Sequence, residues 1–159
     1  EVMDIRGEDI IPHVIEPSYG IDRMCYAVLE QAYDEDIADG ETRTVMHLSP
    51  GVAPVQVAVF PLMTRDGLDI IADEITQTFH KRGILAEYDD SGAIGRRYRR
   101  QDEIGTPFAI TVDYESKENN TVTLRSRDTM KQVRIAITDL PQIVEALIKG
   151  TIPFASLIP

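Results

Sequence analysis

The chain has 159 residues, 43% of them hydrophobic, and a formal net charge of −11. This length suits about one domain, and the apolar fraction is enough to fill its core. A single cysteine excludes a disulfide scaffold, and no charge-free run approaches the roughly 20 apolar residues that a membrane helix needs. We expect a folded cytoplasmic protein with no membrane contact and no DNA partner, because acidic charge opposes binding to phosphates.

The side chains that usually ligate metals are scattered along the chain. Cys25 and the three histidines form no CxxC or HExxH pattern. We predict no metal site.

The amino-terminal stretch DIIPHVIEPSYGIDRMCYAVLEQAY predicts a strand, a Glu-Pro-Ser turn and then a helix. Four apolar residues at helical spacing are expected on the inner side of that helix. They are Ile21, Val28, Leu29 and Ala32.

A shift in charge divides the chain into two units. Residues 1–50 carry 3 basic and 12 acidic side chains, whereas 51–159 carry 13 and 15. Glycines and prolines interrupt the pattern between the two, in ADGETRTVMHLSPGVAP. We predict a first unit at 1–36, a linker at 37–51 and a second unit at 52–159.

The second unit alternates strands and helices in a legible order. VQVAVFPL predicts a buried strand, and Leu68, Ile71, Ala72, Ile75 and Phe79 give the next segment helical spacing up to Gly83. The segments that follow are ILAEYDD (strand), IGRRYRRQDEIG (short helix), FAITVDY, NTVTLRSR and QVRIAI (strands), and a last helix capped by Asp139 and ended by Gly150.

This order, βαβαβββα, predicts an α/β fold with a mixed sheet flanked by about three helices. Its first strands should be parallel and joined by right-handed crossovers.

The segment SGAIGRRYRR concentrates positive charge around Tyr98, with four arginines in five positions: Arg96, Arg97, Arg99 and Arg100. One interpretation is a surface helix whose arginines neutralise nearby carboxylates such as Asp89 and Asp102. The other is a contact surface for phosphates and bases, which a planar guanidinium can grip and stack on.

Tyr114 ends the predicted strand FAITVDY, where a ring can leave the core and stack on an unpaired base. The alternative is that it is the last core residue on the strand face that carries Phe108, Ile110 and Val112. In the neighbouring strand, Arg125 and Arg127 alternate with apolar or small residues and are expected on the polar face.

Gly20-x-Asp22-Arg23 at the helix entrance resembles motif 3 of class II aminoacyl-tRNA synthetases, in which a strand leads into a helix and the arginine binds ATP. The alternative for Arg23 is a helix-end ion pair with Asp22 or Glu16.

Three blocks taken together, PHVIEPSYGIDR, DDSGAIGRRYRRQDEIGTPFAITVDYE and TVTLRSRDTMKQVR, resemble the carboxyl-terminal portion of the archaeal and eukaryotic glycyl-tRNA synthetase family. The resemblance implies that residues 1–36 end the catalytic domain and that 52–159 form the anticodon-binding domain.

The resemblance also implies roles for single residues. It assigns Glu16 and Ser18 to the glycine pocket, and Arg23 to ATP. It points to Arg96 and Tyr114 as anticodon contacts, and less directly to Arg97, Arg99 and Arg100. Asp102 and Glu103 are expected to fix the fold of the segment.

The activity implied is that of glycine–tRNA ligase: ATP with Mg²⁺ activates glycine, and the glycyl group passes to glycine tRNA. The intact enzyme is expected to be a homodimer. Motifs 1 and 2 are absent from this sequence, so we expect no catalytic residue here, no cofactor bound by the fragment alone, and no glycyl-adenylate formation.

Two alternatives remain. The first is that the chain is a non-catalytic, synthetase-like interaction module. The combined presence of Glu16, Ser18 and Arg23 argues against this alternative. Otherwise it is an unrelated α/β nucleotide-binding domain, although the sequence contains no phosphate-binding P-loop.

Overall fold

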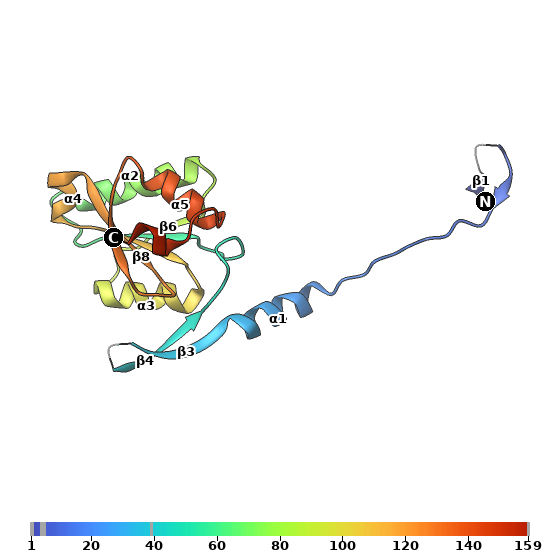
Figure 1. Cartoon of the computed structure of the whole chain (residues 1–159), viewed down its shortest axis with the longest axis horizontal. Helices are drawn as coiled ribbons and strands as arrows, with labels where there is room; N and C mark the ends of the chain where they lie inside the picture. The colour runs from blue at the N-terminus through green and yellow to red at the C-terminus, as the bar shows by residue number, and fades with distance from the viewer. Residues whose placement is uncertain (1, 4–5, 39, 159) are drawn as a thin grey trace.

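The computed structural model describes residues 2–3, 6–38 and 40–158. A layered α/β unit carries an amino-terminal arm that projects away from it (Figure 1). Among the described residues, no helix is long and apolar enough to cross a membrane.

The core of the unit is a five-stranded sheet with the order β6-β5-β7-β8-β9. Its strands are β5 (Val57–Pro61), β6 (Ala86–Tyr88), β7 (Phe108–Val112), β8 (Thr121–Ser126) and β9 (Gln132–Ala136). β5 pairs in parallel with β6 and β7, whereas β7, β8 and β9 pair antiparallel. The predicted α/β class with a mixed sheet, parallel at its start, is confirmed.

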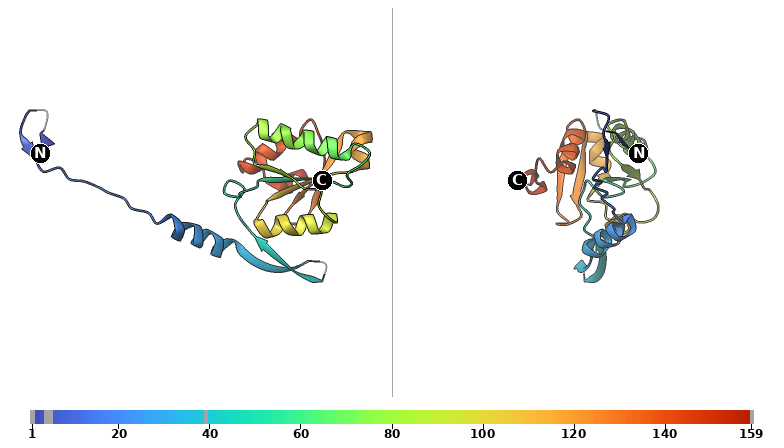
Figure 2. Two further views of the ribbon diagram at one scale, coloured as in Figure 1. Left: turned by 180° about the vertical axis from the view of Figure 1, so that it is seen from behind. Right: turned by 90° about the vertical axis from the view of Figure 1, so that its right-hand side faces the viewer.

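Helices cover both faces of this sheet. α2 (Leu68–Lys81) and α5 (Leu140–Ile148) lie on one face and α3 (Ile94–Ile104) on the other (Figures 1 and 2). Apolar positions three and four apart on α2, including Leu68, Ile75 and Phe79, pack into the main core against β5 and β7. The turn η1 (Phe154–Leu157) closes this side, with Phe154 stacked on Phe108 at 6.4 Å between ring centroids.

Asp139 occupies the N-cap position of α5, but its side chain does not cap the helix. It accepts a hydrogen bond from the Thr138 hydroxyl at 3.2 Å instead. The predicted cap is wrong in this detail, because the N-cap backbone has a helical ψ of −19° in place of the extended conformation that side-chain caps use.

The segment predicted as a linker contains regular structure. β3 (Tyr33–Ala38) and β4 (Glu41–Met46) form an antiparallel hairpin, with Asp36 directly opposite Arg43. β4 of the hairpin packs against α3. Val45 of β4 is buried, as are Leu48 and Ala53 in the segment that follows the hairpin. Residues 37–38 and 41–46 therefore lie in regular strands.

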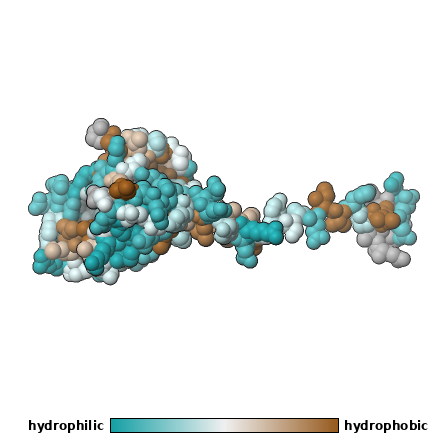
Figure 3. All heavy atoms as spheres, turned by 90° about the horizontal axis from the view of Figure 1, so that it is seen from below, coloured by the Kyte–Doolittle hydropathy of each residue, from teal (hydrophilic) through white to brown (hydrophobic). Residues whose placement is uncertain are grey.

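The amino-terminal arm differs from the expectation in two ways. The strand predicted before the Glu16-Pro17-Ser18 turn is shorter than expected: it is limited to β2 (Asp9–Ile10), which pairs with β1 (Val2–Met3), and residues 11–20 have no regular structure. α1 (Ile21–Ala32) forms as predicted, but of its four inner residues only Ala32 is buried. Apolar side chains remain exposed along this arm, as the brown atoms at the right of Figure 3 show.

Candidate functional site

The candidate site lies at the edge of the sheet where the three parallel strands end. α2 follows β5 on one face and α3 follows β6 on the other, so the two crossover connections next to β5 run on opposite faces of the sheet (Figure 2). In open α/β sheets, ligands bind outside the carboxyl ends of the strands at such a switch point. The first turn of α3 and the start of α4 (Tyr114–Asn119) both lie at this edge.

The arginine cluster lies on α3, and its four members point to different surroundings. Arg96, in the first turn, is exposed, and its side chain donates no hydrogen bond to the residues that the structure describes. Arg99 is about one-third exposed and donates to the Thr42 carbonyl of β4 at 3.1 Å. Arg100 is exposed and pairs with Asp89. Of the four arginines, Arg96 is the most available to a partner.

Arg97 is buried, with 4% of its surface exposed. Its guanidinium donates to the carbonyl of Pro61 at the end of β5, and to those of Asp90 and Gly92 at 2.8 Å each. It therefore fixes the turn before α3 to the sheet. This placement argues against the RNA contact predicted for Arg97, because each of these bonds would have to break first.

Tyr114 does not end the strand as predicted. β7 stops at Val112, and Tyr114 is the first residue of α4. Tyr114 is 42% exposed, and its hydroxyl donates to the Asp66 carboxylate at 2.9 Å. Of the two interpretations of Tyr114, the structure favours the exposed ring over the core residue.

Asp113 holds the start of α4 and so fixes Tyr114. Its carboxylate accepts from the Ser116 amide at 3.0 Å, while the Asp113 amide donates to the Ser116 hydroxyl at 3.0 Å, which makes a capping box. Arg134 of β9 donates to the same carboxylate through both terminal nitrogens. The hydrogen bond from Arg134 is the main cause that lowers the pKa of Asp113, and it outweighs the effect of burial.

This shift predicts a pH-dependent contribution to stability. Because the pKa of Asp113 is lower in the folded chain, the contribution is complete above the unfolded-state pKa of about 3.9 and is lost as pH falls through the folded-state pKa. We expect Arg134→Met to lower the free energy of unfolding by about 1–2 kcal/mol at pH 7, and by progressively less below pH 4. Urea unfolding at pH 7, 5 and 3 measures this.

The control for that experiment is Lys149→Met, which breaks an exposed pair with Glu145 on α5. Its effect should stay within about 0.5 kcal/mol at each pH. A loss for Arg134→Met that is equally large at pH 3 and pH 7 would contradict the assignment to Asp113.

Beside α3 the open face of the sheet is polar and hollowed. A hollow of about 710 Å³ lies between the hairpin, α3 and the β8–β9 end of the sheet. Its lining includes Arg96, Arg99 and Gln132. Below them, Arg125 lies over the Tyr98 ring at 4.7 Å, and the Tyr98 hydroxyl is 2.6 Å from that of Thr111. Burial raises the pKa of Tyr98, so this phenol stays neutral.

Arg125 and Arg127, which are predicted on the polar face of the strand, are both buried. Arg125 faces α3 and pairs with Asp102, with nitrogen–oxygen distances of 3.0 and 3.2 Å. Alternation along the strand predicted the polar character of these positions, but not that a helix covers them. Asp102 holds the fold of this segment, as expected, whereas Glu103 is exposed.

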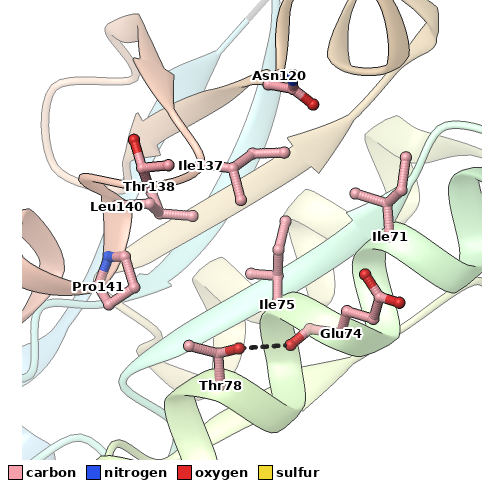
Figure 4. A pocket seen from close by; sticks show the side chains of 9 residues that line it. All are labelled: Ile71, Glu74, Ile75, Thr78, Asn120, Ile137, Thr138, Leu140 and Pro141. Atoms are coloured by element: carbon pink, nitrogen blue, oxygen red, sulfur yellow. Dashed lines mark hydrogen bonds between the residues drawn. The ribbon is translucent and has the colours of Figure 1, made fainter.

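The opposite face of the sheet offers a different surface. A hollow of about 360 Å³ lies between α2 and the start of α5, lined mainly by Ile71, Ile75, Ile137, Leu140 and Pro141 (Figure 4). Its lining contains no arginine or lysine. This hollow therefore lacks the charged donors that nucleic-acid phosphates require.

The residues assigned to glycine and ATP all lie on the amino-terminal arm. Glu16 and Ser18 are exposed in the irregular segment, and Arg23 is exposed in the first turn of α1. Within the described part of the chain, Arg23 forms no ion pair with Asp22 or Glu16. The arm that carries these three residues projects away from the sheet edge that carries α4 (Figure 1).

Comparison with known proteins agrees with this architecture. Residues 56–147 match the model of the anticodon binding domain family, and the chain belongs to that family. Prolyl-tRNA synthetase from Cryptosporidium parvum, in complex with L-proline and AMP, has a similar fold, with a TM-score of 0.62 and 25% identity over 67% of this chain and 24% of that one.

Archaeal relatives are more similar in sequence. Glycine–tRNA ligase of Methanothrix thermoacetophila is 51% identical over 152 residues, which cover 96% of this chain and 26% of the relative. That of Archaeoglobus fulgidus is 52% identical over 141 residues, 89% of this chain and 25% of the relative. The chain thus spans about a quarter of the length of these curated relatives.

Proposed function

We propose that this chain is the carboxyl-terminal part of a glycine–tRNA ligase and that its residues 52–159 recognise the anticodon of glycine tRNA. The observation that carries the proposal is the 51–52% identity to glycine–tRNA ligases over about nine-tenths of the chain or more. A module selected only for an unrelated interaction has no reason to keep this similarity through both the arm and the sheet.

The chemistry of the sheet edge suits an unstacked RNA base. The Arg96 guanidinium offers paired donors to a base edge or a phosphate, and the exposed Tyr114 ring offers a face for stacking. The hollow beside Arg96 gives a neighbouring nucleotide room without moving the backbone. Arg99 and Arg100 lie on the same helix and supply further positive charge near the backbone phosphates.

The net charge of −11 does not oppose this proposal. Electrostatic contact is local within about 8 Å in physiological salt, and the acidic excess lies mainly in residues 1–50. The charge does predict weak binding by the chain alone, with a strong dependence on salt.

In the parent enzyme, we propose that the arm contributes to glycine activation in the cytoplasm. Glu16 would bind the ammonium group of glycine, Ser18 would line the same pocket, and Arg23 would neutralise ATP phosphate charge. Among the described residues, no group of three His, Cys, Asp or Glu side chains is arranged to hold a metal. A homodimeric parent is part of the same proposal.

Fluorescence anisotropy tests the anticodon assignment. The full chain is titrated with glycine tRNA and with the same tRNA carrying a changed anticodon, at low and moderate salt. We expect the native anticodon to bind about tenfold or more tightly, because one bidentate base contact discriminates by roughly 1–3 kcal/mol. Arg96→Ala should remove most of this preference.

Arg82→Ala is the matched control, because it removes one exposed arginine at the end of α2, on the opposite face of the sheet. It should change the affinity for both RNAs equally and leave the preference intact. Equal binding of the two RNAs by the unmodified chain would contradict anticodon recognition and favour an interaction module.

A further inference from the structure

The hairpin β3–β4 is joined to α3 by side chains that are almost fully buried. Arg43 of β4 and Asp102 of α3 each have 2% of their surface exposed. Together with Asp36 and Arg125 they form what we call the buried ion cluster. Each charge in it has a partner of opposite sign.

Arg43 is the centre of this cluster, because one guanidinium reaches three elements. It donates to Asp36, its cross-strand neighbour, through Nε at 2.7 Å and through Nη2. Nη1 donates to Asp102 Oδ2 at 3.1 Å and to the carbonyl oxygen of Arg127 at 3.1 Å. Arg43 thus ties the hairpin both to α3 and to the end of β8.

Three more contacts fix the same junction. Arg127 donates to the carbonyls of Leu48 at 3.0 Å and Gly105 at 2.7 Å. Gly105 ends α3 with a φ of +87°, and a Cβ there would lie 2.8 Å from the Leu48 side chain. Arg99 donates from α3 to the Thr42 carbonyl. The hairpin therefore has little freedom to slide or rotate on α3.

The hairpin also determines the direction of α1. α1 ends at Ala32 and β3 begins at Tyr33, with no loop between them. The His47 amide at the end of β4 donates to the Ala32 carbonyl at 2.6 Å. Whatever holds the hairpin in place therefore holds the last turn of α1.

We propose that Arg43 and Asp102 are positioning residues that fix α1, which carries Arg23, relative to α3, which carries Arg96. The inference rests on the proposed function, in which one tRNA is read at α3 while its acceptor end reacts near the arm. A charged cluster specifies one geometry through directed hydrogen bonds, whereas an apolar contact alone would tolerate several.

Electron–electron distance measurement between two spin labels on the full chain tests this directly. The labels are placed at Gln31→Cys on α1 and Gln77→Cys on α2, both exposed, with Cys25→Ser to leave two cysteines. We expect a narrow distance distribution for this chain and at least a twofold broader one when Arg43→Met is added. Asp102 remains paired with Arg125 in that variant, so the sheet side of the cluster stays neutral.

Arg134→Met is the matched control, because it also removes a paired arginine but one on β9 that does not contact the hairpin. It should leave the distribution unchanged. Hydrogen exchange of β5 and β7 amides shows whether Arg43→Met keeps the sheet folded. If Arg43→Met unfolds the sheet, the distance measurement is repeated with Arg43→Lys, which keeps the charge but cannot reach all three partners. If the folded Arg43 variant gives a distance distribution as narrow as that of the unmodified chain, the proposal is overturned.

Anisotropy on the same variants separates this inference from the proposed function. Arg43→Met should bind glycine tRNA within about twofold of the unmodified chain, because Arg96 and Tyr114 are not altered. An unmodified chain that binds no tRNA would count against the proposed function alone, since the distance measurement contains no RNA. A broader distribution with unchanged affinity is the result expected of a positioning role.

Discussion

Replacing Asp102 with asparagine is expected to lower the free energy of unfolding by about 3–5 kcal/mol. The change is nearly isosteric, but it removes the carboxylate that accepts from both Arg43 and Arg125. Arg125 would then have no described ion-pair partner, although it is only 8% exposed. Breaking a buried pair costs more than the pair contributes, because the remaining charge stays desolvated. Urea unfolding at pH 7, followed by circular dichroism, measures the loss.

Glu103→Gln is the control for this prediction. It removes one negative charge from the adjacent position of α3, but Glu103 is exposed, so its effect should stay within about 0.5 kcal/mol. Equal losses from the two changes would assign the effect to the charge of the helix. A near-neutral Asp102→Asn would show that the arginines find water or other partners, and would contradict the burial on which the buried ion cluster depends.

The sheet could be predicted from sequence because its signals are local. β-Branched runs and apolar residues at helical spacing indicated each strand and helix from β5 to α5 in the observed order, apart from the single turn of α4. Tyr114 was assigned to a strand because the alternation continues through Val112. The strand ends at a capping box formed by Asp113 and Ser116, which is the local signal for the start of α4. The alternating apolar pattern continues past this signal.

The hairpin was missed because its signals are weak or non-local. Its first strand, YDEDIA, is dominated by acidic residues, and the ion pairs that hold it join residues 59 and 7 positions apart. The dipeptide Asp39-Gly40 between two short runs is the one local indication, since it is typical of a two-residue hairpin turn. Which arginine satisfies which carboxylate depends on the tertiary fold.

In the arginine segment, helical periodicity does distinguish the buried arginine from its exposed neighbour. Ile94, Arg97 and Gln101 recur at helical spacing, and they lie on the side of α3 that is turned inward. Arg96, one position away, falls outside it. The sequence could therefore have separated Arg96 from Arg97 by helical phase, although it could not show that backbone carbonyls receive the buried guanidinium.

This difference between neighbouring arginines predicts the second large effect. We expect Arg97→Met to lower the free energy of unfolding by about 3 kcal/mol, because it removes donors from carbonyls at the end of β5 and in the turn before α3. Most of this loss is expected from the bond to the Pro61 carbonyl, because Pro61 is buried. Asp90 and Gly92 are exposed, so water can replace the guanidinium at their carbonyls. Urea unfolding gives the difference.

Arg96→Met is the matched change, with the same charge and side-chain type removed one position earlier. Arg96 is exposed and its side chain bonds to none of the described residues, so its replacement should alter the free energy of unfolding by less than about 0.5 kcal/mol. The effects on RNA binding should be the opposite of those on stability. Arg96→Met should lose the anticodon preference although it is folded, whereas Arg97→Met should keep the preference at temperatures where it is folded. Loss of preference in a folded Arg97→Met chain would mean that the turn it holds, rather than Arg96 alone, forms the contact surface.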